Sequence, residues 1–111
     1  MAMNKLIDEV KDLIEKEYGR AGAKFGLTNH SDHESYAVLL EEFQEAQAEA
    51  HSFEHHMKEF WECVKGDYAP YDKFVTCVDM EKKALLCACE MIQVAAMSKK
   101  AAMTICERGN P

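Results

Sequence analysis

Three glutamates and one glutamine occupy spacings that could hold a metal ion. Glu42 and Glu45 lie three residues apart in an acidic segment, and Glu90 and Gln93 lie three residues apart in an apolar one. Residues three apart share a face of an α-helix, so each pair can converge on one point. Two carboxylates from one helix that face a third from another suit Mg²⁺, which binds oxygen ligands and completes its octahedron with waters and phosphates.

The surroundings of Glu90 sharpen this prediction. The stretch 84–97 reads ALLCACEMIQVAAM and is apolar on every side except at Glu90 and Gln93, so we expect it to be the most buried helical segment. An ionised carboxylate in a core needs a partner, because burial of a lone charge is strongly unfavourable. Glu90 could therefore share a cation with Glu42 and Glu45, or form a salt bridge to a buried lysine or histidine. For Glu42 and Glu45 the alternative is a solvated acidic face.

Three helices must position these residues. Apolar side chains at helical spacing predict helices over about residues 4–23, 32–65 and 71–107, and a break near Asp79 is an open alternative for the last one. We therefore expect a single all-α domain over residues 1–111, built from a long helical hairpin and an N-terminal helix.

Capping signals support these boundaries. Ser31 and Glu34 have the S-x-x-E spacing of a capping box, which begins a helix. Gly66 is expected to end the second helix, and Gly109-Asn110-Pro111 is a stop signal after the third.

The length of the second helix bears on assembly. About 33 residues at 1.5 Å each extend over roughly 50 Å, whereas a 100-residue domain is about 26 Å in diameter. The helix therefore either bends or is covered by a second subunit. Because an apolar stripe of this length needs more cover than one chain provides, we favour a homo-oligomer, a dimer or a tetramer, that completes the helical bundle.

Charge and composition exclude several classes of protein. The net charge is −7, and residues 31–67 carry ten acidic and two basic side chains, which argues against nucleic acid as a partner. No apolar run is long enough for a membrane span, and the N-terminal residues do not form an ordinary secretory signal. Five cysteines without a C-x-x-C spacing fit reduced thiols, so we expect a cytoplasmic protein that does not bind membranes.

The histidines suggest a rival metal site. His51 and His55 are four residues apart and His56 follows directly, a density that can bind Zn²⁺ or Ni²⁺. The alternative is that all three are surface residues. The sequence disfavours a ferritin-like di-iron centre, because that site needs E-x-x-H on two helices and no E-x-x-H occurs in the sequence.

The order of the two glutamate pairs resembles a known family. A long helix with Glu42-Phe43-Gln44-Glu45, followed by Cys89-Glu90-Met91-Ile92-Gln93-Val94-Ala95 in an apolar helix, is similar to the MazG-like all-α nucleoside triphosphate pyrophosphohydrolases over about residues 34–103. The resemblance implies that Glu42, Glu45 and Glu90 are metal ligands and catalytic residues. Mg²⁺ there holds the triphosphate while water attacks to give a monophosphate and pyrophosphate. The layout also resembles small proteins of bacterial and prophage genomes.

One position departs from the family pattern. Gln93 stands where the family has the aspartate of E-x-x-D, and a neutral ligand weakens the hold on Mg²⁺. The resemblance therefore leaves three alternatives: a Mg²⁺-dependent pyrophosphohydrolase, a member that binds a nucleotide without cleaving it, or a member that has lost the site entirely. Gln93 is then an auxiliary contact, and Lys99 and Lys100 either contact phosphates or form a solvated last turn. A separate hypothesis is a non-catalytic acidic helical interaction protein of bacterial or prophage origin.

Overall fold

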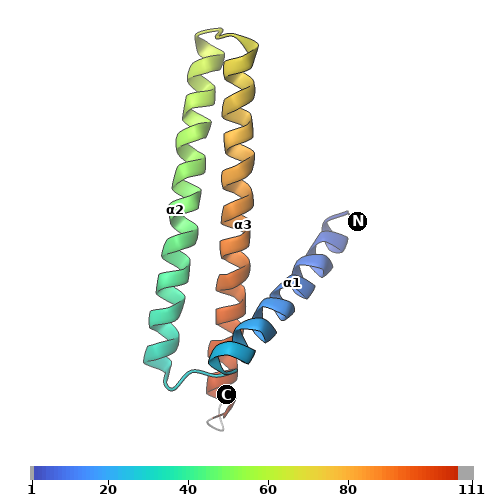
Figure 1. Cartoon of the computed structure of the whole chain (residues 1–111), viewed down its shortest axis with the longest axis vertical. Helices are drawn as coiled ribbons and strands as arrows, with labels where there is room; N and C mark the ends of the chain where they lie inside the picture. The colour runs from blue at the N-terminus through green and yellow to red at the C-terminus, as the bar shows by residue number, and fades with distance from the viewer. Residues whose placement is uncertain (1, 108–111) are drawn as a thin grey trace. The chain divides into compact units, whose positions relative to one another are not determined.

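The computed structural model describes residues 2–107, which form three α-helices (Figure 1). Helix α1 comprises Ala2–Phe25, α2 comprises Asp32–Lys65, and α3 comprises Pro70–Glu107 without a break at Asp79. The all-helical prediction is confirmed, since residues 2–107 contain no strand. The stop signal expected at residues 109–111 lies outside the described residues.

Helix α1 ends at a glycine in the left-handed conformation. Gly26 has a φ of +92°, and its N–H donates to the carbonyl of Gly22 at 2.8 Å. This is the αL motif, in which the residue after the helix satisfies a carbonyl of the last turn. The helix therefore continues two residues past the predicted end at position 23, to Phe25.

Helix α2 begins at the serine of the predicted capping box. Ser31 Oγ accepts a hydrogen bond from the backbone N–H of Glu34 at 3.0 Å, as an N-cap residue should. The carboxylate of Glu34 instead contacts His30, with Oε2 at 3.0 Å from Nδ1. The hydrogen bond to Ser31 that a capping box requires is therefore present, whereas the side chain of Glu34 contacts His30, which precedes the helix.

The turn after α2 depends on the backbone conformation of Asp67 and on the small size of Gly66. Asp67, not Gly66, has the positive φ, at +49°. The N–H of Tyr68 donates to the carbonyl of Cys63, five residues earlier, at 2.9 Å. This is the hydrogen bond of a Schellman motif that joins the residues farther apart in sequence. Gly66 permits close approach instead, because a Cβ there would collide with the ring of Tyr68.

The chain divides into two compact units. The first contains the residues up to Phe43 and those from Glu90 onward, and the second contains Gln44–Cys89. The first unit therefore combines two segments that are distant in sequence, whereas the second is one continuous segment.

The second unit is an antiparallel hairpin formed by the end of α2 and the start of α3. Lys83 Nζ lies 3.5 Å from Glu49 Oε2, and the thiol of Cys87 donates to the carbonyl of Ala46 at 3.5 Å. Ala46 is 2% exposed. A small residue at this point lets the two helices approach closely.

The first unit is held together by a buried polar cluster. The hydroxyl of Thr104 accepts a hydrogen bond from the N–H of Asn29 at 2.8 Å and donates to the carbonyl of Lys100 at 2.7 Å. The side-chain amide of Asn29 donates to Ser35 Oγ at 2.8 Å. The cluster joins the connection between α1 and α2 to the last turns of α3.

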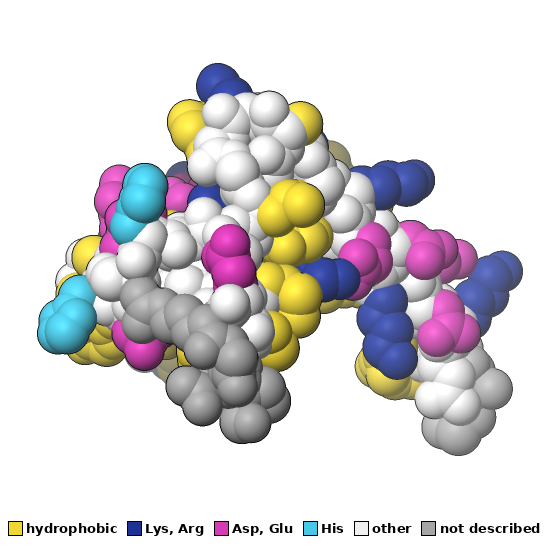
Figure 2. Space-filling view, turned by 90° about the horizontal axis from the view of Figure 1, so that it is seen from below, with side chains coloured by type: hydrophobic (Ala, Val, Ile, Leu, Met, Phe, Trp, Pro, Cys, Tyr) yellow, Lys and Arg dark blue, Asp and Glu magenta, His cyan; other side chains and the backbone are white. Residues whose placement is uncertain are grey.

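The predicted burial of residues 84–97 is only partly correct. Ala96 is fully buried, but Leu85 is 63% exposed and Glu90 is half-buried. Within this chain α3 packs through one face, so apolar residues on its other faces are uncovered. Figure 2 shows apolar side chains at the surface among charged ones. Among the described residues, no helix has an apolar stretch that could cross a membrane.

The buried polar cluster leads to a stability prediction. Thr104→Val keeps the shape of the side chain but leaves the buried N–H of Asn29 without its acceptor, so we expect a loss of about 1–3 kcal/mol in the free energy of unfolding. Urea denaturation monitored by circular dichroism measures this change.

Thr76→Val provides the matched control. The hydroxyl of Thr76 donates only to carbonyls of its own helix, Asp72 and Lys73. We expect a change within about 0.5 kcal/mol for this variant. Equal losses for the two variants would contradict the anchoring role of Thr104.

Candidate functional site

The first unit contains a cavity of about 420 Å³, which is within the size range of small-molecule sites. Its wall comes from the end of α1, the connection to α2, the first turns of α2 and the last third of α3. The lining residues are Glu17, Arg20, Ala21, Phe25, Asn29, Glu34, Val38, Glu42, Gln93, Met97 and Lys100.

Helical periodicity accounts for this lining. Glu34, Val38 and Glu42 follow one another at intervals of four residues along α2, so they form one stripe. Gln93 and Lys100 lie on one face of α3, two turns apart. Two of the residues predicted for phosphate or auxiliary contacts therefore face the same cavity as Glu42.

Glu42 and Glu90 come together in the first unit, although 48 positions separate them in the chain. Each offers a carboxylate oxygen, and these two oxygens lie within 4.8 Å of one another. One carboxylate oxygen of each residue is also shielded from solvent. Two oxygens on one Mg²⁺ are about 3 Å apart when adjacent and about 4.2 Å apart when opposite, so small side-chain rotations would fit both carboxylates to one ion.

Glu45 lies one helical turn beyond Glu42 on α2. It is exposed. It belongs to the second unit, whereas Glu42 and Glu90 belong to the first. The E-x-x-E spacing thus brings its two carboxylates close together within α2.

The two adjacent lysines have different surroundings. Lys100 is 8% exposed and lines the cavity, and its ammonium group forms no hydrogen bond or ion pair with any residue in the described part of the chain. Lys99 does not line the cavity. Its Nζ lies 2.5 and 2.6 Å from the two carboxylate oxygens of Glu15 and 5.0 Å from the ring centre of Tyr18. Lys100 is therefore the lysine that can meet an anion inside the cavity.

Two further carboxylates at the cavity are held ionised. Hydrogen bonds from the guanidinium of Arg20, at 2.5 and 3.0 Å, lower the pKa of Glu17. The hydrogen bond between the imidazole of His30 and Glu34 lowers the pKa of that carboxyl, and the charge of Lys100 contributes in the same direction. Both side chains are therefore anionic at neutral pH.

Sequence reasoning did not assign Glu17, Arg20, Phe25 or Glu34 to a site. Glu34 is part of a sequence motif, but its spacing from Ser31 indicated only a helix cap. The other three lie in or at the end of a helix whose predicted role was packing. Their part in the cavity depends on how α1 packs in the first unit.

The histidines of the rival site lie within six consecutive residues of α2, and the ring centres of His55 and His56 are 5.6 Å apart. His51 and His55 are exposed, whereas His56 is half-buried. Within the described residues, the cluster of potential metal ligands that lies within 4.8 Å contains glutamates and no histidine.

Comparison with known proteins gave no relative: no protein-family model matches the chain, and no similar curated protein or solved structure was found. The resemblance to MazG-like enzymes therefore stays a hypothesis that rests on the glutamate motifs.

The pairing of Glu17 leads to a pH prediction. Because its pKa is lower in the folded chain, ionised Glu17 stabilises the fold above the ordinary pKa of a glutamate, and this contribution is lost as the pH falls through the lowered value. Arg20→Gln removes the hydrogen bonds, so the pKa of Glu17 should rise toward its ordinary value. An NMR titration of the Glu17 carboxyl carbon measures this shift.

Lys24→Gln is the matched control, since it removes the same charge from the same helix. Lys24 lies over the ring of Phe25 rather than beside Glu17. The titration of Glu17 should stay the same in this variant. A similar rise in both variants would show that helix charge, not the hydrogen bonds of Arg20, sets the pKa.

Proposed function

We propose that this chain binds a nucleoside triphosphate together with Mg²⁺, as a MazG-like protein, and acts as a pyrophosphohydrolase that releases pyrophosphate. Glu42, Glu45 and Glu90 are the proposed metal ligands and catalytic residues. The observation that carries the proposal is that Glu42, Gln93 and Lys100 line one cavity and that a carboxylate of Glu90 lies beside that of Glu42.

Electrostatics supports a cation at the glutamates. Carboxylates within 4.8 Å of one another repel when both are ionised, and a divalent cation between them would replace this repulsion with attraction. Bound Mg²⁺ would supply positive charge to neutralise the phosphates. Gln93, one turn after Glu90 on α3, can offer its amide oxygen to the cation or its N–H to a phosphate.

Lys100 supports an anion in the same cavity. A buried ammonium group is unfavourable without a negative partner, and a phosphate oxygen would supply one through a charge-assisted hydrogen bond. Phe25 also lines the cavity and is 68% exposed, so its ring is available for contact with a base.

Assembly and location belong to the same proposal. Phe74 and Leu85 are 64% and 63% exposed in the single chain, which supports a homo-oligomer in which a second copy covers them. We place the protein in the cytoplasm, where its five cysteines stay reduced.

Thermal unfolding with a panel of nucleoside triphosphates, with and without Mg²⁺, tests the proposal. A ligand at a hundred times its Kd adds about 2.7 kcal/mol, which corresponds to a rise of roughly 10 °C or more in Tm for a domain of this size. Glu42→Gln and Glu90→Gln should each weaken Mg²⁺-dependent binding at least about tenfold, because even outer-shell partners of a metal contribute that much. Glu41→Gln, exposed on the same helix, is the control and should bind normally.

The outcomes separate the alternatives. A rise in Tm with release of pyrophosphate supports the enzyme, and a rise without it supports nucleotide binding alone. A flat panel contradicts both and favours the acidic interaction protein. A loss of about 3–5 kcal/mol in Glu90→Gln without ligand would instead identify Glu90 as half of a buried ion pair.

The two lysines allow a paired test of the phosphate contact. Lys100→Met keeps the side-chain length but removes the charge, so triphosphate affinity should fall about ten- to a hundredfold. Lys99→Met should leave affinity unchanged, because Lys99 pairs with Glu15. Isothermal titration calorimetry of both variants measures the difference.

Stability in the absence of ligand is the second measurement for Lys100→Met. Lys100 forms no ion pair with a described residue, so the removed cost of burying its charge should offset the lost attraction to Glu34, and the free energy of unfolding should change little. Equal loss of affinity in the Lys99 and Lys100 variants would contradict a specific role for Lys100.

A further inference from the structure

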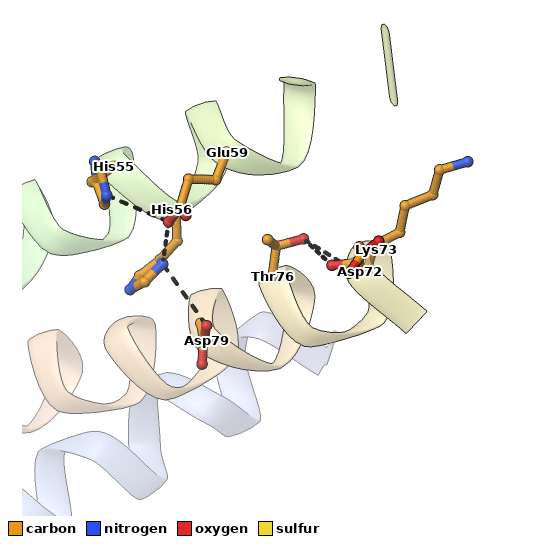
Figure 3. Close-up of polar contacts among 7 residues, drawn as sticks. All are labelled: His55, His56, Glu59, Asp72, Lys73, Thr76 and Asp79. Atoms are coloured by element: carbon orange, nitrogen blue, oxygen red, sulfur yellow. Dashed lines mark hydrogen bonds and ion pairs between the residues drawn. The ribbon is translucent and has the colours of Figure 1, made fainter. Parts of the chain in front are cut away.

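The second unit has a face of α3 that the hairpin does not use. Lys83 and Cys87 contact α2 from one side of α3. Figure 3 shows Asp79 directed toward His56 of α2, at 4.0 Å. Leu85 lies two positions from both Lys83 and Cys87, which is roughly 200° around the helix, so it points away from α2. Its side of α3 is the outer face of the hairpin.

The outer face of α3 carries a heptad repeat. Six exposed positions follow one another at alternating intervals of three and four residues: Tyr71, Phe74, Val78, Glu81, Leu85 and Ala88. Five of them are apolar, and Tyr71, Phe74 and Leu85 are 73%, 64% and 63% exposed. This spacing aligns the side chains along one line, on which a second helix can pack as in a coiled coil. The outer face therefore fits a helix as its partner.

The charged side chains beside this face lack partners in their own chain. Four of the five lysines in Gln44–Cys89, a segment that the structure describes in full, form ion pairs with acidic residues: Lys58 with Glu54, Lys65 with Glu62, Lys73 with Asp67, and Lys83 with Glu49. Lys82 is the exception. The side chains of Lys82, Asp72 and Glu81 form no hydrogen bond or ion pair with any described residue. All three are thus available to a partner.

Charge decides the direction of a partner helix that is a second copy of α3. In a parallel pair, Glu81 would meet Glu81 of the other copy within the apolar line, and such like charges repel. In an antiparallel pair centred between Phe74 and Val78, Lys82 of each copy faces Asp72 of the other. Phe74 of each copy then packs against Val78 of the other. The outer face is therefore complementary to itself in the antiparallel direction.

We propose that the outer face of α3 pairs with the same face of a second copy in the antiparallel direction. Tyr71 of each copy then donates a hydrogen bond from its hydroxyl to Glu81 of the other, which gives that carboxylate a partner. The inference rests on the homo-oligomer in the proposed function and specifies its contact surface. It does not depend on the nucleotide site, because the residues of this face lie within Gln44–Cys89.

Aromatic side chains provide much of the area that such an interface needs. Each aromatic residue contributes about 150–250 Å², so Tyr68, Tyr71 and Phe74, which are 51%, 73% and 64% exposed, offer roughly 400 Å² per copy. A stable interface buries at least about 600 Å² of each partner. Val78 and Leu85 supply most of the remainder, since Leu85 reaches the turn of the second copy that contains Tyr68.

Sedimentation equilibrium of the full chain tests the pairing. The chain of 12.6 kDa should have twice this mass in solution. Phe74→Gln should weaken dimerisation at least about a hundredfold, because an aromatic anchor is lost from both copies. Circular dichroism should show the helix content of the unmodified chain, since Phe74 is mostly exposed in the single chain.

A charge exchange tests the antiparallel direction. Lys82→Asp places a negative charge opposite Asp72, and Asp72→Lys places a positive charge opposite Lys82, so each should weaken dimerisation at least about tenfold. The double variant restores opposite charges and should recover the affinity. Lys58→Asp is the matched control, because it makes the same charge change on α2, where Lys58 pairs with Glu54. It should dimerise like the unmodified chain.

The outcomes distinguish this pairing from the proposed nucleotide site. A monomer at every concentration contradicts the pairing and the proposed homo-oligomer, and it is also the result expected if the face binds a different protein. A dimer that Phe74→Gln leaves intact, a double variant that does not recover, or an equal loss in Lys58→Asp overturns the pairing alone. All these variants keep Glu42, Glu90 and Lys100, so thermal unfolding with Mg²⁺ and nucleotides measures the nucleotide site separately.

Discussion

The hydrogen bonds at Thr104 are the interaction on which the first unit depends. Thr104 is 1% exposed, accepts a hydrogen bond from the backbone of Asn29 and donates to the carbonyl of Lys100. The segment between α1 and α2 is thereby tied to α3, 75 positions later. Among the described residues of this unit, the buried hydrophobic ones are Ala21 and Ala96, both of which are small. Directional hydrogen bonds therefore contribute more to the geometry of this unit than bulky apolar packing does.

That geometry explains the electrostatics of the cavity. The carbonyl that Thr104 contacts belongs to Lys100, whose side chain lines the cavity near the carboxylates of Glu34 and Glu42. The cavity thus combines a buried positive charge with several negative ones. A ligand that carries both signs, such as a phosphate bound to a divalent cation, matches this arrangement better than a simple anion or a simple cation does.

The ligand type bears on which metal the proposed glutamate site would take. The glutamates around Glu42 offer only oxygen. Ligand type and geometry, more than affinity alone, decide which metal a protein site takes, and a set of carboxylates favours Mg²⁺ over zinc and other transition metals.

The departure at Gln93 affects the proposed chemistry through charge. An aspartate there would add a third anionic group to Glu42 and Glu90, and glutamine keeps only a neutral oxygen. Each lost charge lowers the affinity for Mg²⁺, so Lys100 and the carboxylates must compensate if the site holds a triphosphate. The chain could therefore bind a triphosphate with Gln93 and still not cleave it. A contact that binds substrate and transition state equally does not raise the rate of reaction.

The sequence by itself determined the all-helical fold, the start of α2 at the Ser31 cap, and the helical spacing of Glu42 with Glu45 and of Glu90 with Gln93. These features follow from helical periodicity and capping, which depend on residues a few positions apart. Only the tertiary structure decided that Lys100 rather than Lys99 lines the cavity, that Glu42 approaches Glu90, that Asp79 joins His56, and that Glu17 and Arg20 contribute. Those outcomes depend on which faces of distant segments pack together, and periodicity alone does not specify them.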